Sequence, residues 1–199
     1  MKILVSSCLL GENVRYDGEN SAIAYNTSSS FCEKELFMDI MCEHSIYSFC
    51  PEVSGGLSTP REEAEIISST KPFKIQTKSG ENITINFLIG AKNTLELCKE
   101  ENIIVALLKS KSPSCANDGI YDGTFGHNLV PGVGITTKLL EDNGIKVFTE
   151  NQINELAKYI NPNLNHIILS NILKGLNPIS YTHLTLPSTI PQMIPVSPP

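Results

Sequence analysis

The sequence predicts an α/β fold, a single three-layer Rossmann-like domain with a mainly parallel sheet. Strand-like and helix-like segments alternate along most of the chain, and this order is typical of parallel strands joined by covering helices. Residues 103–108 read Ile-Ile-Val-Ala-Leu-Leu, the unbroken apolar run expected of a central strand buried on both faces. With 199 residues, the chain is long enough for one domain with a sizeable core and too short for two comfortable ones.

The first half of the chain supplies most of the predicted sheet. Its segments, in order, are a strand, a helix and two more strands, at 3–7, 32–42, 45–49 and 73–77. A long helix then starts at Asn82 or Thr84, each a plausible cap, and runs towards Glu101. Cys98 falls on the apolar face of this helix, so we expect it in the core.

The second half completes the predicted domain, which spans residues 1–160. After the central strand, a Gly-rich loop leads to a helix, a strand and a last helix, at 135–142, 145–148 and 151–160. Thr149 is a plausible cap for the last helix. Residues 161–178 form a C-terminal extension. The stretch SYTHLTLP resembles translated adapter sequence from sequencing libraries, so we expect 179–199 to be a non-native, disordered tail and exclude it from functional reasoning.

Charge and hydropathy exclude several classes of protein. The net charge of -6 and the pI near 5.2 disfavour tRNA as a partner, because phosphate backbones need clustered basic residues. A local patch of Arg61, Lys109 and Lys111 would still accommodate one phosphate. No segment reaches the roughly 18 apolar residues of a membrane span, and the N-terminus is too brief in apolar residues for a signal peptide. We therefore expect a cytoplasmic protein with no membrane partner.

Three of the six cysteines share one kind of position. Cys8 and Cys50 directly follow predicted strands, and Cys115 follows the central strand after a short loop. The carboxyl ends of parallel strands lie at one edge of the sheet, where open α/β folds place their sites, so these three thiols are expected to converge. The alternative is three unrelated buried cysteines. The others, Cys32, Cys42 and Cys98, fall in helical patterns, where a small buried hydrophobe is expected.

Several chemistries suit three convergent thiols. Zinc takes four protein ligands, or three and a water, whereas a cubane iron-sulfur cluster with three cysteines keeps one iron open. Thiol redox chemistry is disfavoured because the chain has no Cys-x-x-Cys spacing. Glu52 lies two residues after Cys50, and a carboxylate beside thiolates is suited to general acid or base catalysis. The alternative is that Glu52 is a surface carboxylate at the start of a helix.

Polar residues near these cysteines are further candidates for substrate contacts. Arg15 and Asp17, together with Arg61, are positioned to orient a ring or a phosphate, or else to form turns with structural ion pairs. Ser112 lies three residues before Cys115, in the stretch Ser-Pro-Ser-Cys.

Several separated motifs resemble a bacterial family, formerly uncharacterised, now associated with thiouracil desulfidases. They are SSCLLGENVRYDG, CPEVSGGLSTPREEAEI, GAKNTLEL, and LLKSKSPSC followed by IYDGTF, and they occur in the family's order over roughly residues 2–155. The resemblance implies a 4Fe-4S cluster held by Cys8, Cys50 and Cys115. One departure is Ala116-Asn117 after the third cysteine, where a glycine is expected.

The same resemblance implies an activity and roles for further residues. The expected reaction removes sulfur as sulfide from a thiolated pyrimidine such as 2-thiouracil, converting C=S to C=O without net redox change. Glu52 and Ser112 correspond to the family's acid/base residues, with Ser114 a rival to Ser112. The expected partner is a small-molecule thiolated base or nucleoside. Two alternatives stay open, a cluster-bearing sensor or scaffold without catalysis and a zinc-dependent hydrolase. The sequence does not indicate an oligomeric state.

Overall fold

A four-stranded parallel sheet forms the centre of the molecule. The structure is a computed structural model and describes residues 1–23, 30–69 and 73–162, so the predicted tail and almost all of the predicted extension lie outside the described residues. The strand order is β2-β1-β5-β8, with bounds Ser45–Phe49, Lys2–Ser6, Val105–Leu108 and Lys146–Thr149. Leu4 pairs with Tyr47 on one side and with Ala106 on the other. The apolar run predicted to be central is therefore an inner strand, β5.

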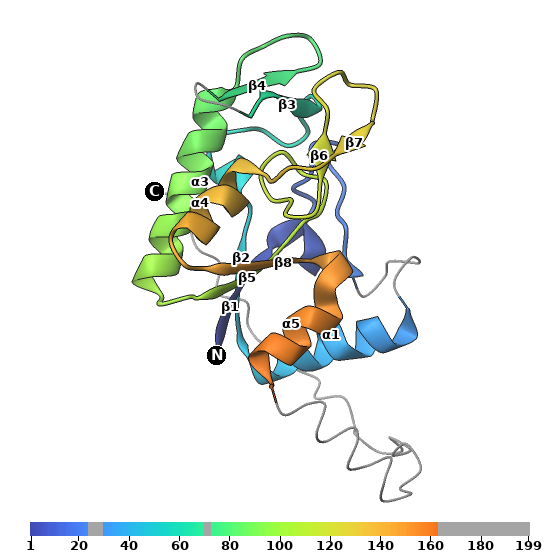
Figure 1. The fold of residues 1–199 in the computed structure, drawn as a ribbon, viewed down its shortest axis with the longest axis vertical. Helices are drawn as coiled ribbons and strands as arrows, with labels where there is room; N and C mark the ends of the chain where they lie inside the picture. Colours follow the sequence, from blue (N-terminus) through green and yellow to red (C-terminus); the bar gives the residue numbers. More distant parts are fainter. Residues whose placement is uncertain (24–29, 70–72, 163–199) are drawn as a thin grey trace, which may run out of the picture.

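Helices cover both faces of the sheet, as expected of a three-layer domain (Figure 1). One face carries α1 (Phe31–Glu43) and α5 (Ile153–Ile160), and the other carries α3 (Thr84–Glu100) and α4 (Ile135–Asp142). Side chains alternate along a strand, so Ile3 and Val5 pack towards α1 and α5 while Leu4 packs towards α3 and α4. Among the described helices, none has the length and apolar character needed to cross a membrane.

A side-chain cap explains where α1 begins. Ser30 accepts a hydrogen bond from the amide of Glu33 at 3.2 Å, and the Glu33 carboxylate accepts one from the Ser30 amide at 2.8 Å, which makes a capping box.

The start of α5 differs from the prediction. The amide of Thr149 donates to the side chain of Gln152 at 3.0 Å, and the short 3-10 helix η3 (Glu150–Gln152) leads into α5. Thr149 therefore caps η3, and the N-cap residue of α5 is Gln152.

Two small antiparallel hairpins lie together at the top of the molecule in Figure 1, away from α1 and α5. They are β3 with β4 and β6 with β7, with bounds Ala64–Ser68, Lys74–Thr77, Ile120–Tyr121 and Leu129–Val130. The strand predicted at 73–77 is thus present but pairs with β3 rather than joining the central sheet. Apolar side chains of both hairpins, among them Ile66, Ile75 and Ile120, form one core cluster with Phe87 of α3.

The short helix α2 (Pro51–Ser54) packs against α3 through two glycines. A Cβ atom on Gly90 would lie 2.0 Å from the carbonyl oxygen of Pro51, and one on Gly55 would lie 2.1 Å from that of Asn86. The Asn86 side chain donates to the carbonyl of Gly55 at 2.9 Å, and Asn93 donates to that of Ser54 at 3.1 Å. These backbone-to-backbone contacts fix the segment that follows β2.

The prediction that all helical cysteines are buried is wrong for two of them. Cys32 and Cys42 are exposed, because α1 turns only Phe37 and Ile40 fully into the core. Cys98 is buried at 1% exposure, and the prediction for it is confirmed.

Gly90→Ala should destabilise the fold by about 2 kcal/mol, within the range for overpacked sites. The added methyl must push the Pro51 carbonyl away, and this cost outweighs the roughly 1 kcal/mol gain in helix propensity. Urea unfolding measures the difference. Lys92→Ala, an exposed change on the same helix, is the control and should stay within about 0.5 kcal/mol of the parent. An unchanged midpoint for Gly90→Ala would contradict the proposed contact.

Candidate functional site

A cavity of about 390 Å³ opens at the carboxyl edge of the sheet, beyond β1, β2 and β5. Cys8, Cys50 and Cys115 all lie in its wall, so the structure brings together the three cysteines that follow strands. Glu52 and Arg61, with Ser112, line the same cavity. Residues far apart in the sequence therefore meet because parallel strands deliver them to one edge.

Each of the first two cysteines sits in a short turn directly after its strand. Cys8 lies in the 3-10 helix η1 (Ser7–Leu10), is 8% exposed, and its carbonyl accepts a hydrogen bond from the amide of Ser21 at 2.8 Å. Cys50 is half-buried between β2 and α2, and its carbonyl accepts from the amide of Ser54 at 3.0 Å. Backbone hydrogen bonds thus fix both residues beside the carboxyl ends of their strands.

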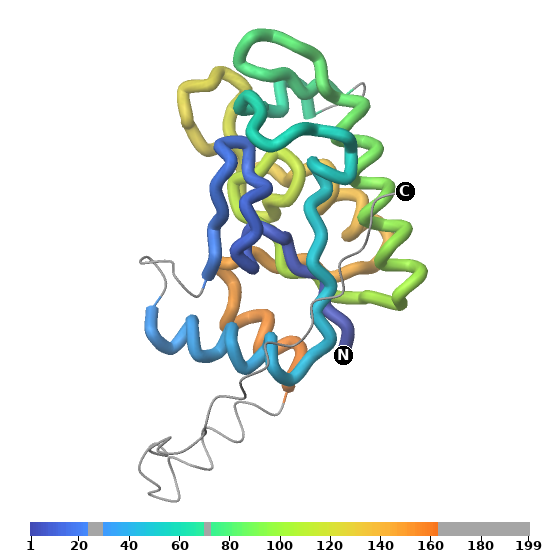
Figure 2. Tube along the Cα trace, turned by 180° about the vertical axis from the view of Figure 1, so that it is seen from behind, coloured from blue at the N-terminus to red at the C-terminus, as the bar shows by residue number. Residues whose placement is uncertain are grey.

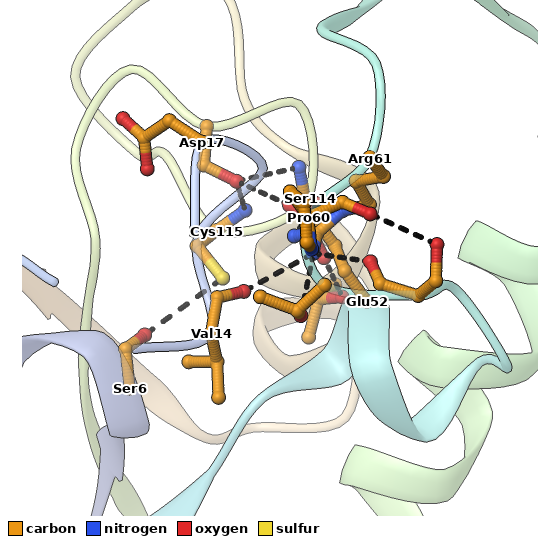
Figure 3. Close-up of polar contacts among 12 residues, drawn as sticks. Ser6, Val14, Asp17, Glu52, Pro60, Arg61, Ser114 and Cys115 are labelled. Atoms are coloured by element: carbon orange, nitrogen blue, oxygen red, sulfur yellow. Dashed lines mark hydrogen bonds and ion pairs between the residues drawn. The ribbon is translucent and has the colours of Figure 1, made fainter. Parts of the chain in front are cut away.

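Ser112 organises the turn that carries Cys115. Its hydroxyl oxygen accepts hydrogen bonds from the amides of Ser114 at 3.1 Å and Cys115 at 3.2 Å. The Cys115 sulfur lies 3.8 Å from the hydroxyl of Ser6, which donates to it from the end of β1 (Figure 3). Cys115 is 4% exposed, so the turn presents a thiol that is nearly sealed from solvent.

The start of α4 holds this turn from behind. The amide of Thr136 donates to the carbonyl of Ser114 at 2.9 Å, and the hydroxyl of Thr137 donates to that of Cys115 at 2.7 Å. The approach requires Gly134, because a Cβ atom there would lie 2.3 Å from the Ser114 carbonyl oxygen. The turn closes without the expected glycine after Cys115, and Ala116 is fully buried.

Ser112 and Ser114 differ sharply in where their side chains lie. Ser114 is 1% exposed, and its hydroxyl is 2.8 Å from that of Thr136, so it joins the turn to α4. It does not line the cavity, whereas Ser112 does. The structure therefore brings Ser112, and not Ser114, to the group of predicted site residues.

The Glu52 carboxylate is held through both oxygens (Figure 3). Arg61 donates to Oε2 from Nη2 at 2.7 Å and from Nε at 3.2 Å, and the hydroxyl of Ser112 donates to Oε1 at 3.1 Å. The side chains of Arg61 and Glu52 are only 9% and 14% exposed, so the pair is sheltered from water. Arg61 is itself fixed by the carbonyls of Val14 at 3.1 Å and Ser58 at 3.0 Å.

Arg15 and Asp17 form an ion pair on the loop that follows η1. Arg15 donates to the Asp17 carboxylate at 2.8 Å and to the hydroxyl of Ser21 at 2.6 Å. Arg15 lines the cavity together with Tyr16, but Asp17 does not. This loop runs beside the segment after α2 (Figure 2), where the amide of Arg61 donates to the carbonyl of Tyr16 at 2.8 Å. Asp17 therefore meets the cavity only through Arg15.

Burial keeps the three thiols protonated. It raises the pKa of Cys8 to about 12, helped by the neighbouring Cys50, and that of Cys50 to about 11, helped by Glu52. Burial raises the pKa of Cys115 as well, with Glu52 as the next cause. Thiolates here need positive charge beside them, and a bound metal group supplies such charge.

The donor set of the cysteine wall suits a soft metal group. Cys8, Cys50 and Cys115 offer three sulfur atoms to one cavity. Thiolates are ligands of both iron-sulfur clusters and zinc. A cubane cluster held by three cysteines keeps one iron without a protein ligand, whereas zinc needs a fourth ligand or a water. The three cysteines therefore fit a cluster.

Lys109, expected from the sequence only as part of a phosphate-binding patch, has a partner that the sequence did not indicate. It lines the cavity and pairs with Glu150, whose carboxylate also accepts from the amide of Ser110 at 2.7 Å. Lys109 follows β5 and Glu150 follows β8, so both stand at the edge that carries the cysteines. The rule that selected the cysteines would have found this pair if applied to charged residues.

Comparisons with known proteins give related sequences and a related structure. The profile of the family described as 2-thiouracil desulfurase matches residues 3–152. The chain is 40% identical over 160 residues to the uncharacterized protein YbbK of Bacillus subtilis (strain 168), covering 77% of this chain and 99% of the relative. A solved structure of the [4Fe-4S]-dependent thiouracil desulfidase TudS is 42% identical, with a TM-score of 0.67, and the match covers 80% of this chain and 97% of that one.

Alkylation of the reduced, metal-free protein should divide the cysteines by burial. At neutral pH, iodoacetamide should modify the exposed Cys32 and Cys42 at least about tenfold faster than Cys8, because only an accessible thiolate reacts. Below pH 12, the thiolate fraction of Cys8 should grow roughly tenfold per pH unit. Peptide mass spectrometry over time measures each site. Cys98, buried and also raised to a pKa of about 12, is the matched control, and equal rates at Cys8 and Cys32 would contradict the burial of Cys8.

Proposed function

Because the chain belongs to the 2-thiouracil desulfurase family, we propose that it replaces the sulfur of a thiolated pyrimidine by oxygen. Water supplies the oxygen and sulfur leaves as sulfide, so C=S becomes C=O and no electrons are gained or lost. The observation that carries the proposal is that three cysteines line one cavity together with Glu52, Arg61 and Ser112. Free thiols of this kind belong in a reducing compartment such as the cytoplasm.

The proposed cofactor is a 4Fe-4S cluster held by Cys8, Cys50 and Cys115. The related solved structure is described as [4Fe-4S]-dependent, and the meeting of three thiols in one cavity wall supports the same group here. When bound by three cysteines, such a cluster supplies one iron without a protein ligand, a Lewis acid suited to a thiocarbonyl sulfur. The chain itself contributes the cysteine ligands for the cluster and a polar group, Glu52 with Ser112, for the attacking water.

Glu52 is the proposed proton carrier. Arg61 occupies one of its oxygens with two hydrogen bonds, while the other oxygen, Oε1, accepts from Ser112. Oε1 is thus the atom that takes a proton from the attacking water and returns it when the sulfur leaves. Low exposure of both side chains keeps competing water from this atom.

Ser112 and Arg15 are the proposed substrate contacts. The Ser112 hydroxyl accepts two backbone amides and donates to Glu52, so its orientation is set before any ligand arrives. Arg15 reaches the cavity with its guanidinium braced by Asp17, which we propose acts only through Arg15. Ser114 supports the turn instead of touching substrate. A cavity of about 390 Å³ suits a base or nucleoside, and the net charge of -6 disfavours tRNA.

Cys115→Ser should abolish cluster binding. Iron and acid-labile sulfide in anaerobically reconstituted protein should fall at least about tenfold, since a thiolate ligand is lost from a site with three. Elemental analysis and visible absorption measure the loss. Cys42→Ser, on the exposed side of α1, is the matched control and should keep full iron content. Zinc in place of iron in the parent protein, or unchanged iron in Cys115→Ser, would overturn the assignment.

Glu52→Gln should keep the cluster and lose sulfide release from 2-thiouracil by about 10²- to 10⁴-fold, as expected for a lost acid/base group. Ser112→Ala should lower turnover by about 10²-fold through misplacement of the carboxylate and substrate. Ser114→Ala is the matched serine control and should lose only about 1 kcal/mol of stability. Sulfide release across thiolated bases, nucleosides and tRNA measures activity and substrate class together. Full turnover of a cluster-loaded Glu52→Gln protein would refute the role of Glu52.

A further inference from the structure

A second group of side chains able to bind a metal lies on the two hairpins, and two of its members, Glu63 and His127, line the cavity. Glu63 and Glu65 belong to the β3 segment, and His127 belongs to the loop between β6 and β7. One ligand atom from each of the three lies within 4.8 Å of the others. We propose that these three side chains bind a divalent transition-metal cation, separate from the cysteine site.

The buried carboxylate of Glu65 is the feature that indicates a bound cation. Its side chain is buried at 1% exposure, and Oε2 accepts one hydrogen bond from the amide of Phe125 at 3.1 Å. The other oxygen, Oε1, is buried and has no hydrogen-bond partner in the described chain. A buried carboxylate is costly unless its charge and lone pairs are compensated. A cation bound at this oxygen compensates both.

Charge balance supports the same conclusion. Glu65 lies on β3 and Glu63 directly precedes that strand, and a carboxylate oxygen of each lies within 4.8 Å of the other. Within the described residues, neither makes an ion pair with a lysine or an arginine, and the only opposing group is His127, whose Nδ1 lies 3.5 Å from Oε1 of Glu63. One divalent cation bound between the two carboxylates offsets the negative charge of both.

The loop that carries His127 is braced by its own side chains. The Asp122 carboxylate accepts from the amide of Thr124 at 3.0 Å and from the side chain of Asn128 at 3.2 Å. The ring of Tyr121 meets that of His127 edge-on, with centroids 5.6 Å apart. Both Glu63 and His127 line the cavity, so a cation between them joins β3 to this loop and fixes the wall that they form.

The donor set indicates the class of cation. One imidazole nitrogen and two carboxylate oxygens are hard to borderline ligands that suit Mn²⁺ and Zn²⁺, with Zn²⁺ the tighter of the two. The cysteine site offers only soft sulfur. Mn²⁺ therefore reports on the new site with little interference from thiols.

The test is to titrate Mn²⁺ into the cluster-loaded protein. Binding is measured as the loss of the electron paramagnetic resonance signal of free Mn²⁺. We expect one saturable site, displaced by Zn²⁺, and thermal unfolding that shifts upward with added Mn²⁺. His127→Ala should weaken Mn²⁺ binding at least about tenfold. Its side chain is 61% exposed, so the protein should still fold, and Glu65→Gln is the second variant.

Glu62→Gln is the matched control because it removes the same charge from an exposed neighbour whose carboxylate accepts from the hydroxyl of Ser79. It should bind Mn²⁺ like the parent. Absence of saturable Mn²⁺ binding, or equal binding by His127→Ala and the parent, would overturn the proposal. No turnover is measured, so either result is independent of whether the protein acts on thiolated pyrimidines.

Discussion

Burial of three thiols at one edge of a parallel sheet is the constraint on which the rest of the structure depends. The strand directions bring the cysteines together, but the direction alone does not fix sulfur positions. Backbone contacts do so, because α2 touches α3 through Gly55 and Gly90, and the start of α4 touches the Cys115 turn through Gly134. Close contacts between backbones leave little freedom for the turns, so the pocket is preformed before any cofactor enters.

Charge in the cavity follows from this burial. Three acidic groups beside a carboxylate would repel one another, and burial alone already raises the pKa values of the thiols. Arg61 offsets Glu52, and Lys109 lies near Cys8, where its charge partly opposes the effect of burial on that thiol. The fixed cations are therefore as much part of the site as the thiols, and they explain how a carboxylate remains available close to sulfur ligands.

Much of the fold is predictable because it follows from local periodicity, and what was missed depends on distant contacts. The strands β1, β2 and β5 and the helices α3 and α4 were predicted near their observed bounds. The strands β6 and β7 have two residues each, and only packing between hairpins defines them. Cys32 and Cys42 were misjudged because helical membership was considered without phase. Phe37 and Ile40 mark the buried face, and neither cysteine lies on it. The roles of Ser112 and Ser114 were undecided for a similar reason, since Thr136 is remote in sequence.

The two walls of the cavity differ in kind, and this difference governs which metal each can hold. The cysteine wall offers sulfur atoms from Cys8, Cys50 and Cys115. The hairpin wall offers oxygen and nitrogen from side chains of graded exposure, with His127 open to solvent and Glu65 sealed. Because sulfur is a softer ligand than oxygen or imidazole nitrogen, the two walls favour different metal ions. The hairpins, of which only the strand at 73–77 was predicted, thus add to the fold a polar wall that the central strands do not provide.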